Sequence, residues 1–324
     1  MMSGQRLDPV SHADIVKARK RLQQVIAPTP LLSMWELNNA VNRSVYVKAE
    51  SLLPVGSFKL RGAYNKISSL SEEEKKRGIV TASAGNHAMG VSLACKWLNG
   101  EATVVVPKTA PETKKSACLS MGAKVIEYGQ TYDDAYKEAR RIENESGRTY
   151  IHSVADADII AGQGTVGLEI LEQLPNVKQI VVPLGGGGLV SGIAIAVKSL
   201  NPSIKVIGVQ PAGSSVYYQS IKENKAVELT HLDTIADGLA VKKVELYTLN
   251  LIKKWVDEVV VVREETIKKA IKLQLLKGKL VVEGAGGAAL AAVMEDLVAN
   301  DDETVIIASG GNIDQSKLID ILEG

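Results

Sequence analysis

The stretch "QIVVPLGGGGLVSGIAIAVKSL", residues 179–200, decides the fold class. A run rich in β-branched residues leads into four consecutive glycines and then into an apolar helical pattern. Residues 180–197 carry no charge, but their proline and glycines argue against a membrane-spanning helix. The stretch is therefore typical of a buried strand that passes through a tight loop into a buried helix.

The same alternation runs through the whole chain. Strand patterns such as "GIVTAS" (78–83) and "TVIIAS" (304–309) alternate with helical patterns such as "HADIVKARKRLQQVI" (12–26). Strands that alternate with helices predict parallel sheets with helices on both faces, an α/β fold. Charged residues become rarer after residue 150, where we predict a domain transition.

Composition excludes several functional classes. The 38 basic and 37 acidic residues of the 324 nearly cancel, so no global field favours nucleic acid or a membrane surface as a partner. The two cysteines form no CxxC pair and the four histidines show no ligand spacing, so we predict no metal site. Without an apolar signal core at the N-terminus, the chain is predicted to be cytoplasmic.

Three strand-to-helix junctions carry unusual loops: "SAGNH" (83–87), "GGGG" (185–188) and "SGGN" (309–312). Ligands of open α/β sheets bind beyond the carboxyl ends of the strands, so we expect the three loops to line one cleft. The N–H groups of the glycine loop suit a phosphate. No Walker lysine and no GxGxxG spacing is present, which favours a monophosphate. A tight packing turn is the alternative.

The other two loops are less specific. Residues 83–87 suit a small carboxylate or a ring oxygen, but serine and asparagine are also ordinary helix caps, and His87 alone is more often structural. Lys59, in "GSFKLRGA" (56–63), could form an imine with a carbonyl cofactor near the phosphate site. Phe58, the only phenylalanine, could cover that cofactor. Alone, Lys59 would be a surface charge.

Taken together, "GSFKLRGA", "SAGNHA", "GGGGLVSG" and "SGGN" resemble the fold-type II pyridoxal-phosphate (PLP) enzymes in order and spacing. The chain is most similar to the threonine/serine dehydratase branch, which includes serine racemases. The resemblance implies two open, twisted, mostly parallel sheets flanked by helices, as in the tryptophan synthase β fold. It also implies a large PLP-binding domain (1–52 and 153–324), a small mobile domain (53–152) and a homodimer or homotetramer.

The resemblance also implies roles for individual residues toward PLP. Lys59 would hold the cofactor as an imine, and its freed amine would remove the substrate α-proton. Phe58 would pack on the pyridine ring, Asn86 would bind the ring hydroxyl, and Ser309 would face the ring nitrogen. The phosphate would be held by the N–H groups of Gly185, Gly186, Gly187, Gly188 and Leu189. The substrate carboxylate would be held by Ser83, Ala84, Gly85, Asn86 and His87.

The implied reaction is β-elimination of water from a small amino acid. L-Threonine would give 2-oxobutanoate and ammonia, and L-serine would give pyruvate and ammonia. The neutral Ser309 favours elimination over transamination. The two substrates differ by one methyl group, worth only about 1–3 kcal/mol in a pocket, so their order is left open.

Several positions depart from relatives of this branch. Racemases carry a second serine where this chain has Ala84, and an alanine methyl cannot move a proton. Gln210 and Val216 stand at the metal-ligand positions of those racemases, which predicts no metal there. The chain ends soon after "SGGN", so the short form without a C-terminal regulatory domain is expected, and nucleotide activation stays open. "HSVADAD" (152–158) replaces the usual phenylalanine and paired aspartates, and Glu283 is kept.

Two alternatives to the dehydratase stay open. One is a serine racemase or hydroxyaspartate dehydratase of the same family. The other is a phosphate- or amino-acid-binding module without catalysis, against which intact Lys59 and Ser309 argue.

Overall fold

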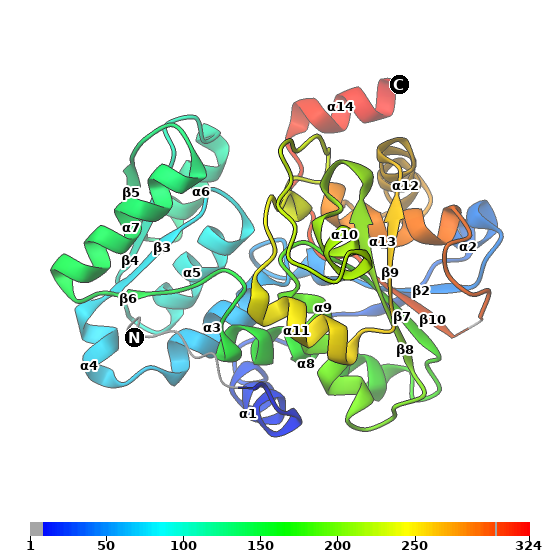
Figure 1. Ribbon diagram of the computed structural model, residues 1–324, viewed down its shortest axis with the longest axis horizontal. Helices are drawn as coiled ribbons and strands as arrows, with labels where there is room; N and C mark the ends of the chain where they lie inside the picture. Colours follow the sequence, from blue (N-terminus) through cyan, green and yellow to red (C-terminus); the bar gives the residue numbers. More distant parts are fainter. Residues whose placement is uncertain (1–8, 302) are drawn as a thin grey trace. The chain divides into compact units, whose positions relative to one another are not determined.

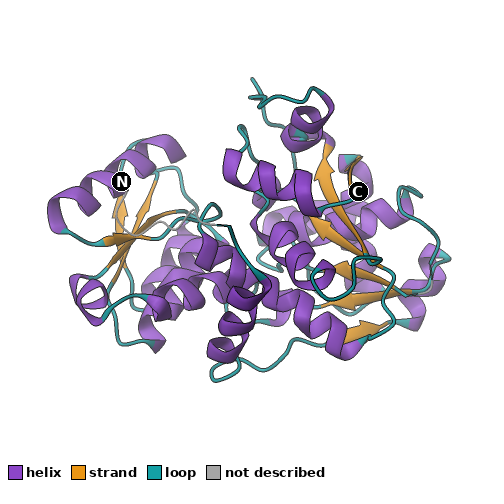
Figure 2. Cartoon of the chain, turned by 60° about the horizontal axis from the view of Figure 1, so that its bottom comes forward, coloured by secondary structure: helices purple, strands orange, loops and turns teal. Residues whose placement is uncertain are grey.

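The computed structural model describes residues 9–301 and 303–324, which form two compact units. The first unit comprises residues up to Ile26 and Lys59–Gln163, and the second comprises Ala27–Phe58 and Gly164–Gly324. Each unit contains one sheet with helices around it (Figure 2). The two mostly parallel sheets confirm the fold class predicted from the sequence. The predicted division into a large domain (1–52 and 153–324) and a small mobile domain (53–152) stays a prediction.

The sheet of the first unit has the strand order β5-β4-β3-β6, and every pair of neighbours is parallel (Figure 1). Its strands are β3 (Ile79–Ala82), β4 (Ala102–Val106), β5 (Lys124–Glu127) and β6 (Thr149–Tyr150). Its helices are α1 (His12–Leu22), α3 (Lys59–Ser69), α4 (Glu72–Arg77), α5 (Asn86–Trp97), α6 (Glu112–Ser120) and α7 (Tyr132–Ser146). Helix α8 (Ala157–Gln173) begins in this unit and ends in the second.

Helix α7 covers one face of this sheet. Its Ala135 and Ala139 are fully buried against Val80, Ala82 and Val105. The helix begins at this point because Thr131 and Asp134 form a capping box, in which each side chain accepts the backbone N–H of the other residue. Small residues on its buried face bring α7 close to the strands.

The sheet of the second unit has the order β1-β2-β10-β7-β8-β9, in which only the β1–β2 pair is antiparallel. Its strands are β1 (Leu31–Ser33), β2 (Val45–Lys48), β7 (Gln179–Pro183), β8 (Lys205–Pro211), β9 (Glu258–Val262) and β10 (Thr304–Ile307). Its helices are α2 (Trp35–Val41), α9 (Gly188–Lys198), α10 (Val216–Lys222), α11 (Leu246–Trp255), α12 (Glu264–Leu276), α13 (Gly284–Met294) and α14 (Gln315–Glu323). Short 3₁₀ turns are η1 (Glu50–Leu52), η2 (Ala212–Ser214) and η3 (Asp237–Leu239).

Two separate apolar clusters lie on the two faces of this sheet. Val181 and Ile306 point into the cluster that contains α12 and α13, whereas Ile180 and Val305 point into the one that contains α9 and α11. Because side chains alternate along a strand, a sheet covered on both faces needs continuous apolar runs. The buried run of β7 meets this requirement and explains why residues 179–183 read as a fully buried strand.

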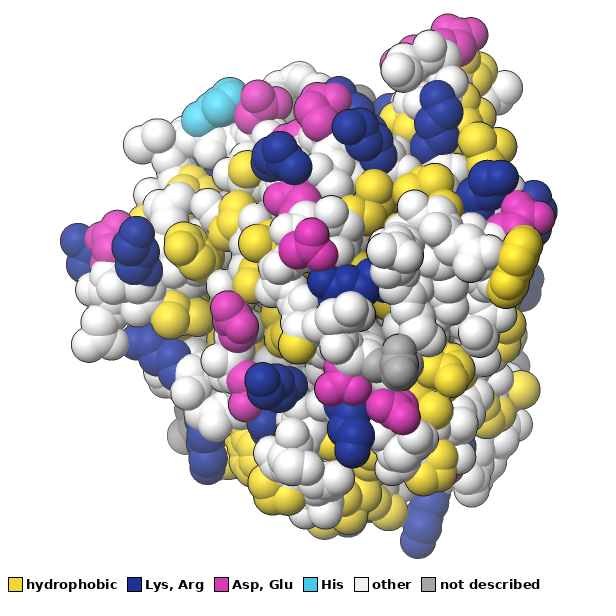
Figure 3. All heavy atoms as spheres, turned by 90° about the vertical axis from the view of Figure 1, so that its right-hand side faces the viewer, with side chains coloured by type: hydrophobic (Ala, Val, Ile, Leu, Met, Phe, Trp, Pro, Cys, Tyr) yellow, Lys and Arg dark blue, Asp and Glu magenta, His cyan; other side chains and the backbone are white. Residues whose placement is uncertain are grey.

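The charges are mixed on the surface. On the face of the molecule that Figure 3 shows, basic and acidic side chains are interspersed. Among the described residues, no helix is both long enough and apolar enough to span a bilayer.

Candidate functional site

The glycine loop connects β7 to α9 in the second unit. Gly187 adopts φ +91°, a backbone conformation that favours glycine, and a Cβ there would lie 2.9 Å from Ile252 Cδ1. A Cβ on Gly185 would lie 2.8 Å from the carbonyl oxygen of Gly238. The loop therefore has room for glycines only at these two positions.

The loop presents backbone donors that the protein itself does not use. Within the described residues, no oxygen accepts a hydrogen bond from the N–H groups of Gly185 to Leu189. Apart from Gly186, which is half-buried, these residues are buried. Buried N–H groups without an acceptor are rare, and at the start of a helix they suit an anion. The loop thus fits the phosphate of a cofactor.

Tyr217 and Thr248 fix the orientation of this loop through its carbonyl group at Gly186. The hydroxyl groups of both residues donate to the carbonyl oxygen of Gly186, each at 2.8 Å, and they lie 2.7 Å from each other. In a trans peptide the N–H points opposite to the C=O, so the N–H of Gly187 points away from both side chains. Burial raises the pKa of Tyr217 to about 12, so its hydroxyl stays a proton donor. Sequence reasoning missed both residues, because a hydroxyl that binds one carbonyl leaves no motif.

The "SGGN" loop follows β10, which lies next to β7 in the same parallel sheet. Two of the three predicted loops therefore leave neighbouring strands at the same edge. Ser309 is buried, with 2% of its surface exposed. The expectation that residues 83–87 share a cleft with these loops stays a prediction, because that loop belongs to the first unit.

The segment before Lys59 is hydrogen-bonded to the "SGGN" loop. The N–H of Phe58 donates to Ser309 O at 3.1 Å, and the N–H of Gly311 donates to Gly56 O at 2.8 Å. Asn312 Nδ2 donates to Val55 O at 2.8 Å. Ser57, in between, is fully buried and its hydroxyl has no partner among the described residues. The segment 55–58 and the "SGGN" loop, about 250 residues apart in sequence, thus lie side by side. The buried hydroxyl group of Ser57 lies in this paired segment.

Lys59 opens α3 in the first unit. Its Nζ donates to the carbonyl oxygen of Ser153 at 3.0 Å. Gly90 of α5 allows the two helices to approach closely, since a Cβ there would lie 3.1 Å from the carbonyl group of Lys59. The close packing against Gly90 therefore fixes the backbone of Lys59, and the hydrogen bond to Ser153 O fixes its amine.

Two histidines, buried His87 and half-buried His152, lie near Lys59. His87 Nε2 donates to Ile151 O at 3.1 Å, and burial first, with the charge of Lys59 second, lowers the pKa of His87 to about 3. His152 Nδ1 accepts the N–H groups of Val154 and Ala155, so its proton is on Nε2. Burial, followed by the charge of Lys59, lowers the pKa of His152 to about 4. Both imidazoles are therefore neutral at pH 7. The hydrogen bond from His87 to Ile151 O joins α5 to the segment that follows β6.

Residues 83–87 lead into α5 in the same unit, and the last two of them are helical. The N–H of Ser83 donates to Val105 O, and its hydroxyl accepts the N–H of Gly85 at 3.2 Å. Asn86 is the first helical residue, and Ser83 through Asn86 are half-buried. The first N–H groups of a helix have no partner within the helix, and a carboxylate is a suitable acceptor for them. The local geometry is compatible with the predicted roles.

Gln210 and Val216 stand where the resemblance implies metal ligands in racemases. Gln210 Oε1 accepts the N–H of Tyr218 at 2.9 Å, and Val216 is fully buried. The amide nitrogen of Gln210 is buried without a partner among the described residues. An amide and a valine side chain do not supply the carboxylate oxygens that a hard cation needs. That no metal binds here stays a prediction.

A glycine loop that fits a phosphate and a lysine at a helix start are both found in enzymes that use a phosphate-bearing carbonyl cofactor. Residues 22–310 match the model of the pyridoxal-phosphate dependent enzyme family. The chain belongs to this family, and its cofactor is pyridoxal 5′-phosphate. The resemblance and the cofactor inferred from the four motifs are thereby confirmed.

Individual relatives agree with this assignment. The L-threonine ammonia-lyase of Thermotoga maritima is 47% identical over 301 residues, which cover 93% of this chain and 75% of that protein. The structure of the processed form of threonine deaminase isoform 2 from Solanum lycopersicum superposes with a TM-score of 0.91 at 37% identity, covering 100% and 91% of the two chains. Maize serine racemase gives 0.91 at 34% identity and covers 97% of both chains.

Proposed function

We propose that this chain is a PLP-dependent threonine/serine dehydratase. It removes water from L-threonine to give 2-oxobutanoate and ammonia, and from L-serine to give pyruvate and ammonia. The observation that carries the proposal is the pairing of residues 55–58 with residues 309–312. This pairing puts neutral Ser309 beside the residue that precedes Lys59. The similarity to the T. maritima L-threonine ammonia-lyase supports the reaction class.

Each part of the site has one task in this proposal. The N–H groups of Gly185 to Leu189 would hold the cofactor phosphate, and Lys59 would bind the cofactor covalently. Phe58 would pack on its ring, Asn86 would bind its ring hydroxyl, and Ser309 would offer a neutral hydroxyl to its ring nitrogen. The bound cofactor withdraws electrons from the substrate α-carbon and so makes the α-proton acidic.

The protein then has to orient the substrate and move one proton. The N–H groups at the start of α5 take the substrate carboxylate, with Ser83 as a second polar contact. The amine of Lys59, when it is not bound to the cofactor, would remove the α-proton. Ser153 O accepts one N–H of that amine and so limits its orientation. Neutral His87 and His152 do not supply competing protons at pH 7.

The test combines an absorbance spectrum with a 2-oxo acid assay on L-threonine, L-serine and D-serine. We expect a visible band and 2-oxobutanoate formation in the wild type, and the loss of both in Lys59→Ala. Lys96→Ala, which removes an exposed lysine of α5, is the matched control and should retain both. A wild-type protein without a visible band in the presence of added PLP contradicts the proposal. That result would leave the phosphate-binding module as the better description.

We also propose that the protein is a cytoplasmic homodimer or homotetramer. Both cysteines, Cys95 and Cys118, are free and buried, which is compatible with a reducing compartment. Trp35 at the start of α2 and Leu276 at the end of α12 are exposed, at 76% and 48%. These two helix ends meet, since Lys277 lies 3.6 Å from Glu36. Exposed apolar side chains that gather favour an interface, and light scattering would measure the oligomeric state.

A further inference from the structure

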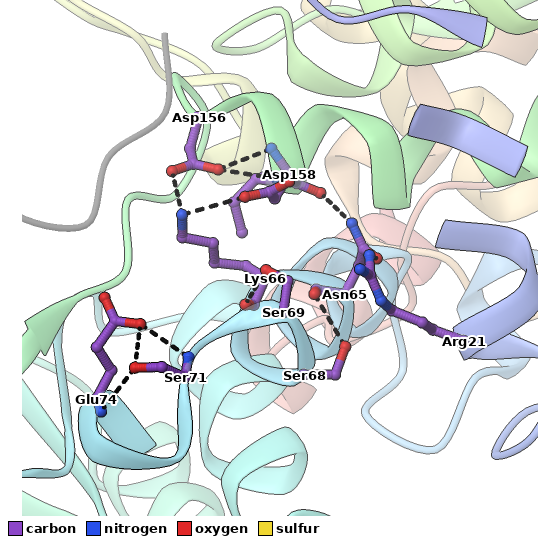
Figure 4. Close-up of polar contacts among 10 residues, drawn as sticks. Arg21, Asn65, Lys66, Ser68, Ser69, Ser71, Glu74, Asp156 and Asp158 are labelled. Carbon is purple, nitrogen blue, oxygen red and sulfur yellow. Dashed lines mark hydrogen bonds and ion pairs between the residues drawn. The ribbon is translucent and has the colours of Figure 1, made fainter. Parts of the chain in front are cut away.

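Lys66 is a buried lysine on the same helix as Lys59, and the site described above does not use it. Its Nζ lies 3.0 Å from Asp156 Oδ2 and 3.3 Å from Asp158 Oδ2 (Figure 4). The side chains of Lys66 and Asp156 are only 5% and 1% exposed. Burying a lysine and two carboxylates costs desolvation free energy, so we ask what function this cluster has.

The carboxylate of Asp156 has a second function at the start of α8. Its Oδ1 accepts the N–H groups of Asp158 and Ile159, at 2.8 and 3.2 Å. A carboxylate at a helix N-terminus satisfies free donors and stabilises the helix. Beside Lys66 on α3, Asn65 Nδ2 donates to Asp158 O at 2.7 Å (Figure 4). The two neighbouring side chains of α3 thus hold the first turn of α8.

The loop 152–155 connects Ile151 to the first turn of α8, and both of its ends are held by hydrogen bonds. At its other end, the N–H of Ile151 donates to Val80 O at 2.9 Å, and Ile151 O accepts from Thr81 and His87. A loop of four residues with both ends fixed has little freedom to move. Ser153, in the middle of this loop, is the residue whose carbonyl oxygen accepts the amine of Lys59.

We propose that Lys66 is a positioning residue for Lys59. The ion pair between Lys66 and Asp156 fixes the position of the loop 152–155. The loop in turn fixes the carbonyl oxygen of Ser153, which accepts the hydrogen bond from the Lys59 amine. Without the charge of Lys66, the buried Asp156 carboxylate loses this counter-charge and moves toward solvent together with the loop. The Lys59 amine then loses its hydrogen bond to Ser153 O. This inference rests on the proposed role of Lys59 as the cofactor lysine.

The experiment compares Lys66→Gln, Lys66→Arg and a matched control. Lys115→Gln serves as the control, because Lys115 is an equally buried lysine of the same unit that is paired with Glu112 and Glu127. In the holoenzyme we expect Lys66→Gln to lower kcat for L-threonine by roughly 10- to 100-fold, as for a catalytic group displaced by about 1 Å. KM should change by less than about threefold, because the substrate-binding loop is not altered. Lys66→Arg should recover most of kcat.

A second readout does not depend on activity. In the protein stripped of cofactor, acetic anhydride labels amines, and mass spectrometry of the peptide that contains Lys59 measures how fast that amine reacts. Lys66→Gln should increase the labelling rate of Lys59 several-fold relative to wild type, whereas Lys115→Gln should not. Lys66→Arg should label like the wild type.

Two results would overturn the inference. One is wild-type kcat and wild-type Lys59 labelling in folded Lys66→Gln. The other is a loss of activity that only follows the loss of folded protein, with Lys59 labelling unchanged. If Lys66→Gln does not fold, Asp156→Asn replaces it, because its amide oxygen can still cap α8 while the charge is gone; the same directions are expected. A wild type without a visible band would instead contradict the proposed function.

Discussion

The backbone N–H of Phe58 donates to the carbonyl oxygen of Ser309 at 3.1 Å, so the residue before Lys59 is joined directly to the serine that follows β10. The pairing continues outward, where Asn312 Nδ2 donates to Val55 O. Because most of these hydrogen bonds join backbone groups, the pairing depends on the backbone conformation of both segments. Gly56 is the residue whose conformation matters most for this pairing.

Gly56→Ala should break this pairing. Gly56 has φ +69°, and a Cβ there would lie 2.5 Å from Asn312 Oδ1, so the alanine must displace the Asn312 side chain. We expect the free energy of unfolding to fall by about 1–3 kcal/mol and the affinity for PLP to fall with it. Urea unfolding and PLP titration followed by absorbance would measure the two effects.

The control for Gly56→Ala is Gly122→Ala. Gly122 has φ +84°, but nothing lies within 4 Å of a Cβ built on it. Both substitutions strain the backbone, so the difference between them isolates the contact with Asn312. Equal losses in the two variants, or unchanged PLP affinity in Gly56→Ala, would show that the pairing does not support the site.

Tyr217→Phe should weaken PLP binding without abolishing it. The change removes one of the two hydroxyl groups that hold the carbonyl oxygen of Gly186, while Thr248 remains. A typical hydrogen bond contributes about 0.5–1.5 kcal/mol, so we expect the dissociation constant of PLP to rise by about 2- to 13-fold. Tyr218→Phe changes the neighbouring, partly exposed tyrosine on α10 and should leave binding unchanged. If both variants bind PLP like the wild type, the orientation of the loop does not depend on Tyr217.

Much of this architecture follows from sequence patterns, but contacts made through backbone carbonyl groups do not. Apolar runs such as β7 and the glycines of its loop have local signals, because burial on both faces and a missing Cβ restrict the residue type. Strand β6 has only two residues, too short for a period to show. Ser153 acts through its carbonyl oxygen, which every residue has, and it meets Lys59 across 94 positions. Within the stretch 152–158, Asp156 caps α8, and an aspartate before a helical pattern is a local signal that sequence reasoning missed.

His87 and His152 should make the protein less stable in acid. The unfolded histidine titrates near pH 6.5, whereas the folded pKa values are about 3 for His87 and about 4 for His152. Between pH 6.5 and about 4 the unfolded chain therefore binds more protons than the folded protein, and stability falls as the pH falls. Each histidine can contribute up to about 1.4 kcal/mol per pH unit in this window.

Urea unfolding at several pH values measures this dependence. His87→Gln should flatten the slope below pH 6.5, whereas His231→Gln, at an exposed position, should not change it. A slope that is the same in His87→Gln and in the wild type would mean that other groups cause the acid sensitivity.

The last prediction concerns racemisation, since serine racemases are among the structural relatives. Ala84, half-buried in the loop before α5, has a side chain that cannot donate a proton. Racemisation needs a proton delivered to the face of the α-carbon opposite Lys59, and a positioned acid contributes about 10²- to 10⁴-fold to such a step. We expect the wild type to convert L-serine to pyruvate with little D-serine, and Ala84→Ser to form D-serine at least tenfold faster. Ala84→Val adds bulk without a proton and should not. Chiral chromatography of the reaction mixture decides the point: abundant D-serine from the wild type would favour the racemase over the dehydratase.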